Sequence, residues 1–150
     1  MQTITPFLWF NDQAEEAMNF YVAIFKDAQV LNVAPGPDGK VLSATFELNG
    51  QEFIALNGGP MYSFTPAISF FVKCETQAEV DYYWEKLTEG GSEEPCGWLK
   101  DKFGLSWQVI PNALGELLGA PNREKAGRAL QAMFQMKKID IAALRAAFDG

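Results

Sequence analysis

The sequence contains no histidine. Histidine is the commonest general base near neutral pH and a frequent ligand of transition metals, so catalysis by a histidine base and a histidine-ligated metal centre are both excluded. Only two cysteines are present, Cys74 and Cys96, and their spacing matches no metal-binding or redox motif. Two isolated thiols are typical of a reducing compartment, and we therefore expect a cytoplasmic protein.

Long apolar runs and basic clusters are also missing. No apolar run approaches the roughly 20 residues that cross a bilayer, and the first ten residues, MQTITPFLWF, lack the basic region and small-residue cleavage site of a signal peptide. The net charge of −7, without a basic run, argues against binding to nucleic acid or to anionic membrane surfaces.

What the sequence does contain is an ordered series of strand and helix signals. With 150 residues, 48% of them hydrophobic, the chain can bury the core of one globular domain. Asp12, followed by Glu15, predicts the start of a helix over residues 12–26. Asn49-Gly50 predicts a tight hairpin. Together with four apolar or alternating runs, at 4–10, 29–34, 41–48 and 51–57, these signals give the order βαβββ.

The same order begins again in the second half. Thr76 and Glu79 form a capping box that predicts a helix over residues 77–89, which Gly90-Gly91 ends. Strands are expected at 67–73, 92–96, 97–100 and 105–110. We therefore predict an α+β fold in which two βαβββ modules, 1–58 and 66–111, form a single domain, 1–111. Its cupped, mixed but mainly antiparallel sheet should carry both helices on the convex side.

Residues 112–150 are predicted to form a C-terminal helical extension. Asn122 and Asp140 are suited to cap two helices. The apolar stripes of these helices exceed what two modules need, and we expect a homodimer that buries them. The alternative is that the extension folds over its own sheet and leaves a monomer. The stripes include the following residues: Leu130, Met133, Phe134, Leu144 and Phe148.

One stretch, CGWLKDKFGLSWQVIP at Cys96 to Pro111, is unusually rich in aromatic and polar side chains. Gly104 suits a tight turn, and in the strand that follows Trp107 and Gln108 fall on opposite faces. Such a strand can form the wall of a pocket, and it can equally belong to an ordinary hairpin.

The chain resembles the vicinal-oxygen-chelate superfamily of glyoxalases, dioxygenases and bleomycin or fosfomycin resistance proteins. The paired modules and the segments NFYVAIF (19–25) and FGLSWQ (103–108) carry this resemblance. The chain is most similar to the PhnB-like group, also labelled 3-demethylubiquinone-9 3-methyltransferase-like. The segments that match this group are ITPFLWF, ATFELNGQEFIALNGGP, TPAISFFV and CGWLKDKFGLSWQVIP.

The resemblance implies a divalent metal bound by side chains of three strands. The corresponding places fall near Thr5 or Pro6, at about Ala67 and at Gln108, and none carries a histidine or a carboxylate. A neutral amide is a weak ligand where a glutamate is usual, and Met61 stands where the PhnB-like group often has a histidine. We therefore expect no metal and no other cofactor.

The methyltransferase label has little support in the residues. A cofactor-binding methyltransferase would be expected to have a glycine-rich turn between a strand and a helix of a parallel sheet. The paired glycines, at 58–59 and 90–91, fall in loops between modules or after a helix. Methyl transfer is therefore not expected.

Polar residues opposite the helix-covered sheet faces are the candidate ligand-binding residues. The resemblance predicts a cavity on that side, whereas on the residues alone several of these side chains could simply face solvent. The candidates are Trp9, Ser43, Thr45, Glu47, Asn57, Ser69, Trp98 and Gln108. Trp98 could stack on a ligand or merely seal the sheet.

Two residues are candidates for chemistry. Asp101, between Lys100 and Lys102, is a possible catalytic acid or base, or else a turn residue that binds its own backbone. Cys96 could be a nucleophile, although no histidine is present to deprotonate it, and a structural thiol is the alternative. Three function classes stay open: a small-molecule-binding protein, an enzyme that needs no metal, and an enzyme with an atypical metal site.

Overall fold

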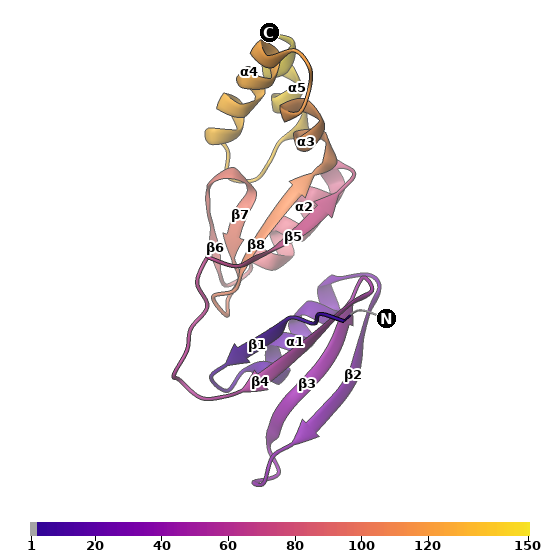
Figure 1. The fold of residues 1–150 in the computed structure, drawn as a ribbon, viewed down its shortest axis with the longest axis vertical. Coiled ribbons are helices and arrows are strands. Elements are labelled where there is room, and N and C mark those ends of the chain that lie inside the picture. Colours follow the sequence, from indigo (N-terminus) through magenta and orange to yellow (C-terminus); the bar gives the residue numbers. More distant parts are fainter. Residues whose placement is uncertain (1–2) are drawn as a thin grey trace. The chain divides into compact units, whose positions relative to one another are not determined.

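The computed structural model describes residues 3–150 and divides into two compact units, the first ending at Phe64 and the second spanning Thr65–Gly150 (Figure 1). Each unit contains one of the predicted βαβββ modules, so the predicted modular α+β fold is confirmed. Each module forms its own four-stranded sheet. The joining of the two sheets into one cupped sheet stays a prediction.

The first unit follows the predicted order closely. Its elements are β1 (Phe7–Phe10), α1 (Ala14–Ile24), β2 (Ala28–Pro35), β3 (Val41–Leu48) and β4 (Gln51–Asn57). The strand order is β1-β4-β3-β2, with β1 parallel to β4 and the other pairs antiparallel. Strands β3 and β4 have the predicted bounds.

Alternation along β3 decides which face of this sheet meets α1. Ala44, Phe46 and Leu48 are buried on one face, and the residues between them are half-buried on the other. Phe46 stacks on Tyr21 of α1 with ring centroids 6.2 Å apart. The Asn49-Gly50 hairpin is confirmed, because both residues have the positive φ values, 48° and 85°, that this turn requires.

The start of α1 corrects one prediction. Asp12 does not cap the helix: the helix begins at Ala14, and Gln13 occupies the cap position without a side-chain hydrogen bond. The first-turn amide is instead satisfied from β4, where Asn57 Oδ1 accepts a hydrogen bond from Ala14 N at 2.8 Å. The Nδ2 atom of Asn57 donates to Val41 O at 3.0 Å. A cap supplied from a strand 43 residues away has no local signal in the sequence.

The second unit repeats the order with shorter strands. It contains β5 (Ser69–Cys74), α2 (Gln77–Thr88), β6 (Ser92–Glu93), a 3₁₀ turn η1 (Pro95–Gly97), β7 (Trp98–Lys100) and β8 (Ser106–Pro111). The strand order is β5-β8-β7-β6, with β5 parallel to β8. The predicted cap of α2 is confirmed, because Thr76 Oγ1 accepts from Glu79 N at 3.2 Å. The predicted strand over 92–96 is cut short by η1, where Cys96 has a φ of 63°.

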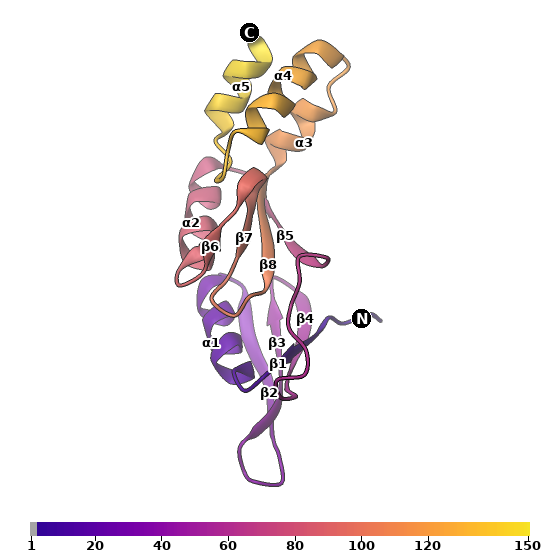
Figure 2. The same ribbon diagram turned by 90° about the vertical axis from the view of Figure 1, so that its left-hand side faces the viewer.

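Three helices follow β8: α3 (Asn112–Leu118), α4 (Arg123–Phe134) and α5 (Ile141–Asp149) (Figure 2). Asn122 and Asp140 cap α4 and α5 as predicted. α3 lies within the predicted helical extension but was not predicted as a separate helix. A buried cluster joins these helices to the end of β8: Ile110, Leu114, Leu117, Ala129, Ile139 and Leu144, with Met133 and Phe148 packed against it. Within the described residues, no helix is long and apolar enough to cross a membrane.

Replacing Asn57 by alanine should destabilise the first unit. The change leaves the Ala14 amide and the Val41 carbonyl without their side-chain partner, which we expect to cost about 1–2 kcal/mol. Urea unfolding measures the loss. Asp12→Ala is the matched control, because Asp12 has no capping role, and it should unfold like the unaltered protein. A greater loss for Asp12→Ala than for Asn57→Ala would contradict the assignment of the cap.

Candidate functional site

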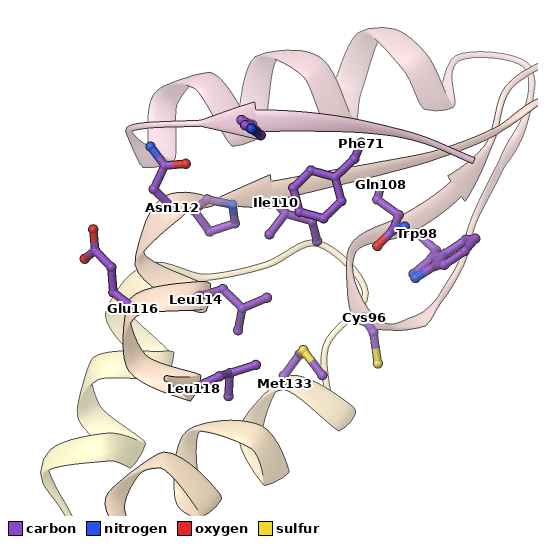
Figure 3. A pocket seen from close by; sticks show the side chains of 13 residues that line it. Phe71, Cys96, Trp98, Gln108, Ile110, Asn112, Leu114, Glu116, Leu118 and Met133 are labelled. Atoms are coloured by element: carbon purple, nitrogen blue, oxygen red, sulfur yellow. The ribbon is translucent and has the colours of Figure 1, made fainter. Parts of the chain in front are cut away.

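A cavity of about 510 Å³ lies in the second unit, between the face of its sheet turned away from α2 and the C-terminal helices (Figure 3). Its size falls within the range of small-molecule sites. The residues that line it are Phe71, Lys73, Cys96, Trp98, Gln108, Ile110, Pro111, Asn112, Leu114, Gly115, Glu116, Leu118 and Met133.

The floor of the cavity is a row of three side chains on adjacent strands. Phe71 of β5 pairs in register with Gln108 of β8, which in turn pairs with Trp98 of β7. Their neighbours in each strand point to the opposite face, where Leu99 and Trp107 are buried. Because side chains alternate along β8, the carboxamide of Gln108 lies in the cavity and the indole of Trp107 lies in the core.

The opposite wall comes from the C-terminal helices. Leu114 and Leu118 of α3 and Met133 of α4 point toward the floor (Figure 3). Leu114 is buried in the cluster that joins these helices to β8, and Leu118 and Met133 pack against that cluster. The cavity wall is therefore continuous with a packed core.

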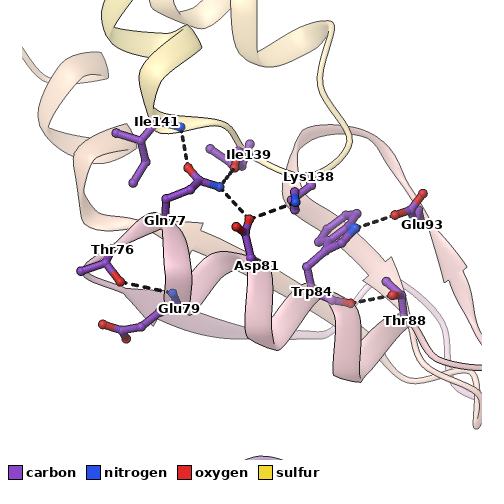
Figure 4. Close-up of polar contacts among 10 residues, drawn as sticks. All are labelled: Thr76, Gln77, Glu79, Asp81, Trp84, Thr88, Glu93, Lys138, Ile139 and Ile141. Atoms are coloured by element: carbon purple, nitrogen blue, oxygen red, sulfur yellow. Dashed lines mark hydrogen bonds and ion pairs between the residues drawn. The ribbon is translucent and has the colours of Figure 1, made fainter.

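The segment between α4 and α5 is fastened to α2 by one glutamine side chain (Figure 4). Gln77 Nε2 donates to Ile139 O at 3.0 Å, and Gln77 Oε1 accepts from Ile141 N at 2.8 Å. Lys138 forms an ion pair with Asp81 at 2.9 Å, and Gln77 Nε2 also donates to Asp81 Oδ1 at 3.0 Å. We call the contacts of Gln77 and Asp81 with this segment the α2 latch.

The pKa of Asp81 lies below its ordinary value of 3.8, first because Gln77 donates a hydrogen bond to its carboxylate and then because Lys138 does so. A lowered folded-state pKa means that the contribution of this carboxylate to stability is present above the unfolded value. It is lost as the pH falls below 3.8 toward the folded value. Both partners are about half exposed, so this contribution is small.

The segment between α4 and α5 is also hydrogen-bonded to η1. Cys96 N donates to Met136 O and Gly97 N to Lys137 O, each at 2.8 Å. Gly97 has a φ of 82°, and a Cβ atom there would lie 2.6 Å from Ile110 Cδ1. Glycine is therefore required where the C-terminal segment crosses the sheet.

Asp101 lies in the turn between β7 and β8 and is buried. Its Oδ1 atom accepts from Phe103 N at 2.9 Å and Leu105 N at 3.1 Å, and its Oδ2 atom accepts from Trp107 Nε1 at 2.9 Å. These three bonds match the turn role that the sequence left as the alternative to catalysis. Asp101 does not line the cavity.

Of the other predicted site residues, three lie together in the second unit. Trp98 and Gln108 line the cavity, and Ser69 Oγ accepts a hydrogen bond from Gln108 Nε2 at 3.0 Å. Cys96 also lines the cavity. Burial, and then the nearby Glu79, raise the pKa of the other thiol, Cys74, to about 12, so that thiol stays protonated at neutral pH.

The remaining candidates belong to the first unit. Ser43, Thr45 and Glu47 lie half-buried on the face of β3 turned away from α1. Trp9 Nε1 donates to Gly59 O at 2.9 Å, and its ring meets Tyr62 edge-on at 5.0 Å. Trp9 is thus packed under the loop after β4. The side chain of Asn57 is hydrogen-bonded to the first residue of α1.

The residues do not fit the metal that the resemblance implies. Among residues 3–150, no three histidine, cysteine, aspartate or glutamate side chains are grouped so that they could hold an ion. At the one expected place on β8, the amide of Gln108 is bonded to Ser69. We therefore derive no metal-dependent step.

Sequence reasoning missed the helical wall of the cavity. Met133 was recognised in an apolar stripe, but we expected a subunit contact to bury that stripe, with packing over the chain's own sheet as the alternative. Residues 112–118 were included in the predicted helical extension, but α3 was not identified as a separate helix. Phe71 was also missed, although strand alternation places it beside Gln108. The stripe gave the only available signal, and it could not say which surface it would cover.

The two modules, each with a helix on one face of a four-stranded mixed sheet, are the architecture of the glyoxalase, bleomycin resistance and dioxygenase superfamily. A family model described as 3-demethylubiquinone-9 3-methyltransferase matches residues 2–110, and the chain belongs to this family. No curated protein matches the chain.

Solved structures support the assignment. A putative 3-demethylubiquinone-9 3-methyltransferase, PhnB protein, from Bacillus cereus is 38% identical with a TM-score of 0.67, over 73% of this chain and 99% of that one. Protein PA1353 from Pseudomonas aeruginosa is 20% identical with a TM-score of 0.62, over 74% and 98% of the two chains. The fosfomycin resistance protein FosX from Listeria monocytogenes, in a complex with Mn(II) and sulfate, is 19% identical with a TM-score of 0.56, over 79% and 99%. The last two show a shared fold.

Gln77→Ala should loosen the C-terminal segment. The substitution leaves Ile139 O and Ile141 N without their side-chain partner. We expect amide hydrogen exchange in α5, which begins at Ile141, to be faster than in the unaltered protein, and exchange in β3 of the first unit to be unchanged. Hydrogen exchange read by mass spectrometry after proteolysis measures both regions. The control is Gln131→Ala, an exposed glutamine of α4. Unchanged exchange in α5 of Gln77→Ala would contradict the latch.

Proposed function

We propose that this protein binds a small, largely apolar molecule in the cavity of its second unit. The observation that carries the proposal is the cavity of about 510 Å³, with apolar walls and a few polar groups on its floor. A concave, mainly apolar site with few polar groups is the usual form of a small-molecule site. The binding residues within it are Trp98 and Gln108, with Ser69 holding Gln108 in position.

Binding without catalysis fits the positions of the acidic groups. The carboxylate of Asp101 holds the turn before β8 and does not line the cavity. The one carboxylate among the lining residues, Glu116, is exposed on α3. We therefore assign Asp101 a structural role. The methyltransferase name belongs to the family model, and no feature of this cavity supports methyl transfer.

Filling the cavity should weaken binding. Met133→Trp places an indole in the cavity, and we expect the affinity for the neutral apolar dye N-phenyl-1-naphthylamine to fall at least about tenfold. Fluorescence titration measures it. The control is Phe134→Trp, one position along α4, where the side chain is half-exposed and does not line the cavity. Equal affinity in Met133→Trp and Phe134→Trp, or no binding by the unaltered protein, would contradict the proposal.

We further propose that the protein forms a homodimer, although the reason differs from the one drawn from the sequence. Most of the C-terminal stripe packs within its own unit, as the alternative interpretation expected. The exposed apolar side chains that motivate a dimer now lie on β2, an edge strand, at Val30, Leu31 and Val33. Edge strands of this kind are commonly paired or covered.

Sedimentation equilibrium tests the assembly. We expect twice the chain mass of 16.6 kDa at micromolar concentration. Leu31→Lys should yield the monomer, because a charge on an edge strand opposes pairing. Phe134→Asp is the control for the extension and should stay dimeric. A monomer mass for the unaltered protein would refute the dimer. Dissociation by Phe134→Asp but not by Leu31→Lys would indicate that α4 forms the subunit contact.

A further inference from the structure

Two polar groups on the cavity floor have hydrogen-bonding capacity left over. Gln108 Nε2 donates to Ser69 Oγ, and its carbonyl oxygen Oε1 accepts no hydrogen bond from any residue between 3 and 150. Within the same range, no residue accepts a hydrogen bond from the indole N–H of Trp98. The two residues are directly opposed in the β7–β8 ladder, and Figure 3 shows both side chains beside Cys96. One donor and one acceptor are thus presented side by side.

The surroundings favour a neutral partner for this pair. Ile110, Leu114 and Met133 supply apolar walls close to the two groups. The partial negative charge of the Gln108 carbonyl oxygen would repel an anion. The partial positive charge of the indole N–H would repel a cation. Lys73 and Glu116 also line the cavity, but both are exposed to solvent and their charges are of opposite sign. A charge desolvated without a buried counter-charge is costly, whereas a neutral group that satisfies both partners is not. A single hydroxyl group can accept from the indole and donate to the carbonyl.

We propose that the cavity selects a neutral apolar molecule that carries a hydroxyl group. The hydroxyl oxygen accepts from Trp98 Nε1, and its hydrogen is donated to Gln108 Oε1. The apolar body lies against the wall formed by Leu114, Leu118 and Met133. This ligand class rests on the proposed function, because it describes the occupant of the same cavity.

Gln108 suits this role for the reason that makes it a poor metal ligand. A carboxylate has no hydrogen to donate, so it could bond to Ser69 only by accepting from the serine hydroxyl, and it would present a negative charge to the cavity. The amide uses its N–H to fix its orientation and leaves a neutral acceptor facing the cavity. Ser69 is accordingly a positioning residue.

The test compares ligands that differ at the hydroxyl group alone. Titration of the protein with 2-naphthol and with 2-methoxynaphthalene, followed by fluorescence or calorimetry, gives the ratio of the two affinities. Methylation removes the donor, so the unaltered protein should bind 2-naphthol about tenfold more tightly. The anion 2-naphthoate should bind more weakly than either.

Three variants assign the preference to the two polar groups. Gln108→Met and Trp98→Phe should each reduce the ratio of affinities toward one, while 2-methoxynaphthalene still binds within about twofold of its original affinity. Phe134→Leu is the control: it alters a half-exposed side chain of α4 that does not line the cavity and should leave the ratio unchanged. Thermal melting of each variant confirms that it folds.

The outcomes separate this inference from the proposed function. Equal affinities for 2-naphthol and 2-methoxynaphthalene in the unaltered protein would overturn the ligand class and leave apolar binding intact. Tighter binding of 2-naphthoate would overturn the neutral character of the ligand. A preference that survives both Gln108→Met and Trp98→Phe would overturn the assigned groups. Failure of all three compounds to bind would count against the cavity itself.

Discussion

The bonds of one buried carboxylate fix the geometry on which the candidate site depends. Asp101 accepts from two amides of its own turn and from the indole of Trp107, and so ties the turn to the strand that follows it. A shift of one residue in β8 would turn Gln108 into the core and Trp107 into the cavity. The opposition of Trp98 and Gln108 is therefore secured by a residue that does not line the cavity.

The cavity combines a floor from the family fold with a wall from outside it. The family model ends at residue 110, and the Bacillus cereus relative aligns over nearly all of its own length but only 73% of this chain. Leu114, Leu118 and Met133 all lie beyond that point. The C-terminal extension therefore gives this chain a cavity whose shape cannot be inferred from the modules alone.

Local signals were sufficient for most of the fold. The alternation of β3, the Asn49-Gly50 turn and the caps at Thr76, Asn122 and Asp140 were all predicted, because each depends on residues close together in sequence. The cap of α1 by Asn57 was missed because its two partners are 43 residues apart. The cavity wall was missed for the same reason: an apolar stripe shows that a helix face is buried, but not against what.

The Gln77 part of the α2 latch binds backbone atoms, and this has a consequence for how the site can diversify. Gln77 bonds a carbonyl oxygen and an amide nitrogen of the C-terminal segment, groups that every residue except proline supplies. The hydrogen bonds of Gln77 therefore do not depend on which side chains form the cavity wall. Substitutions at Leu118 or Met133 can change the wall, and with it the ligand, while these hydrogen bonds stay in place.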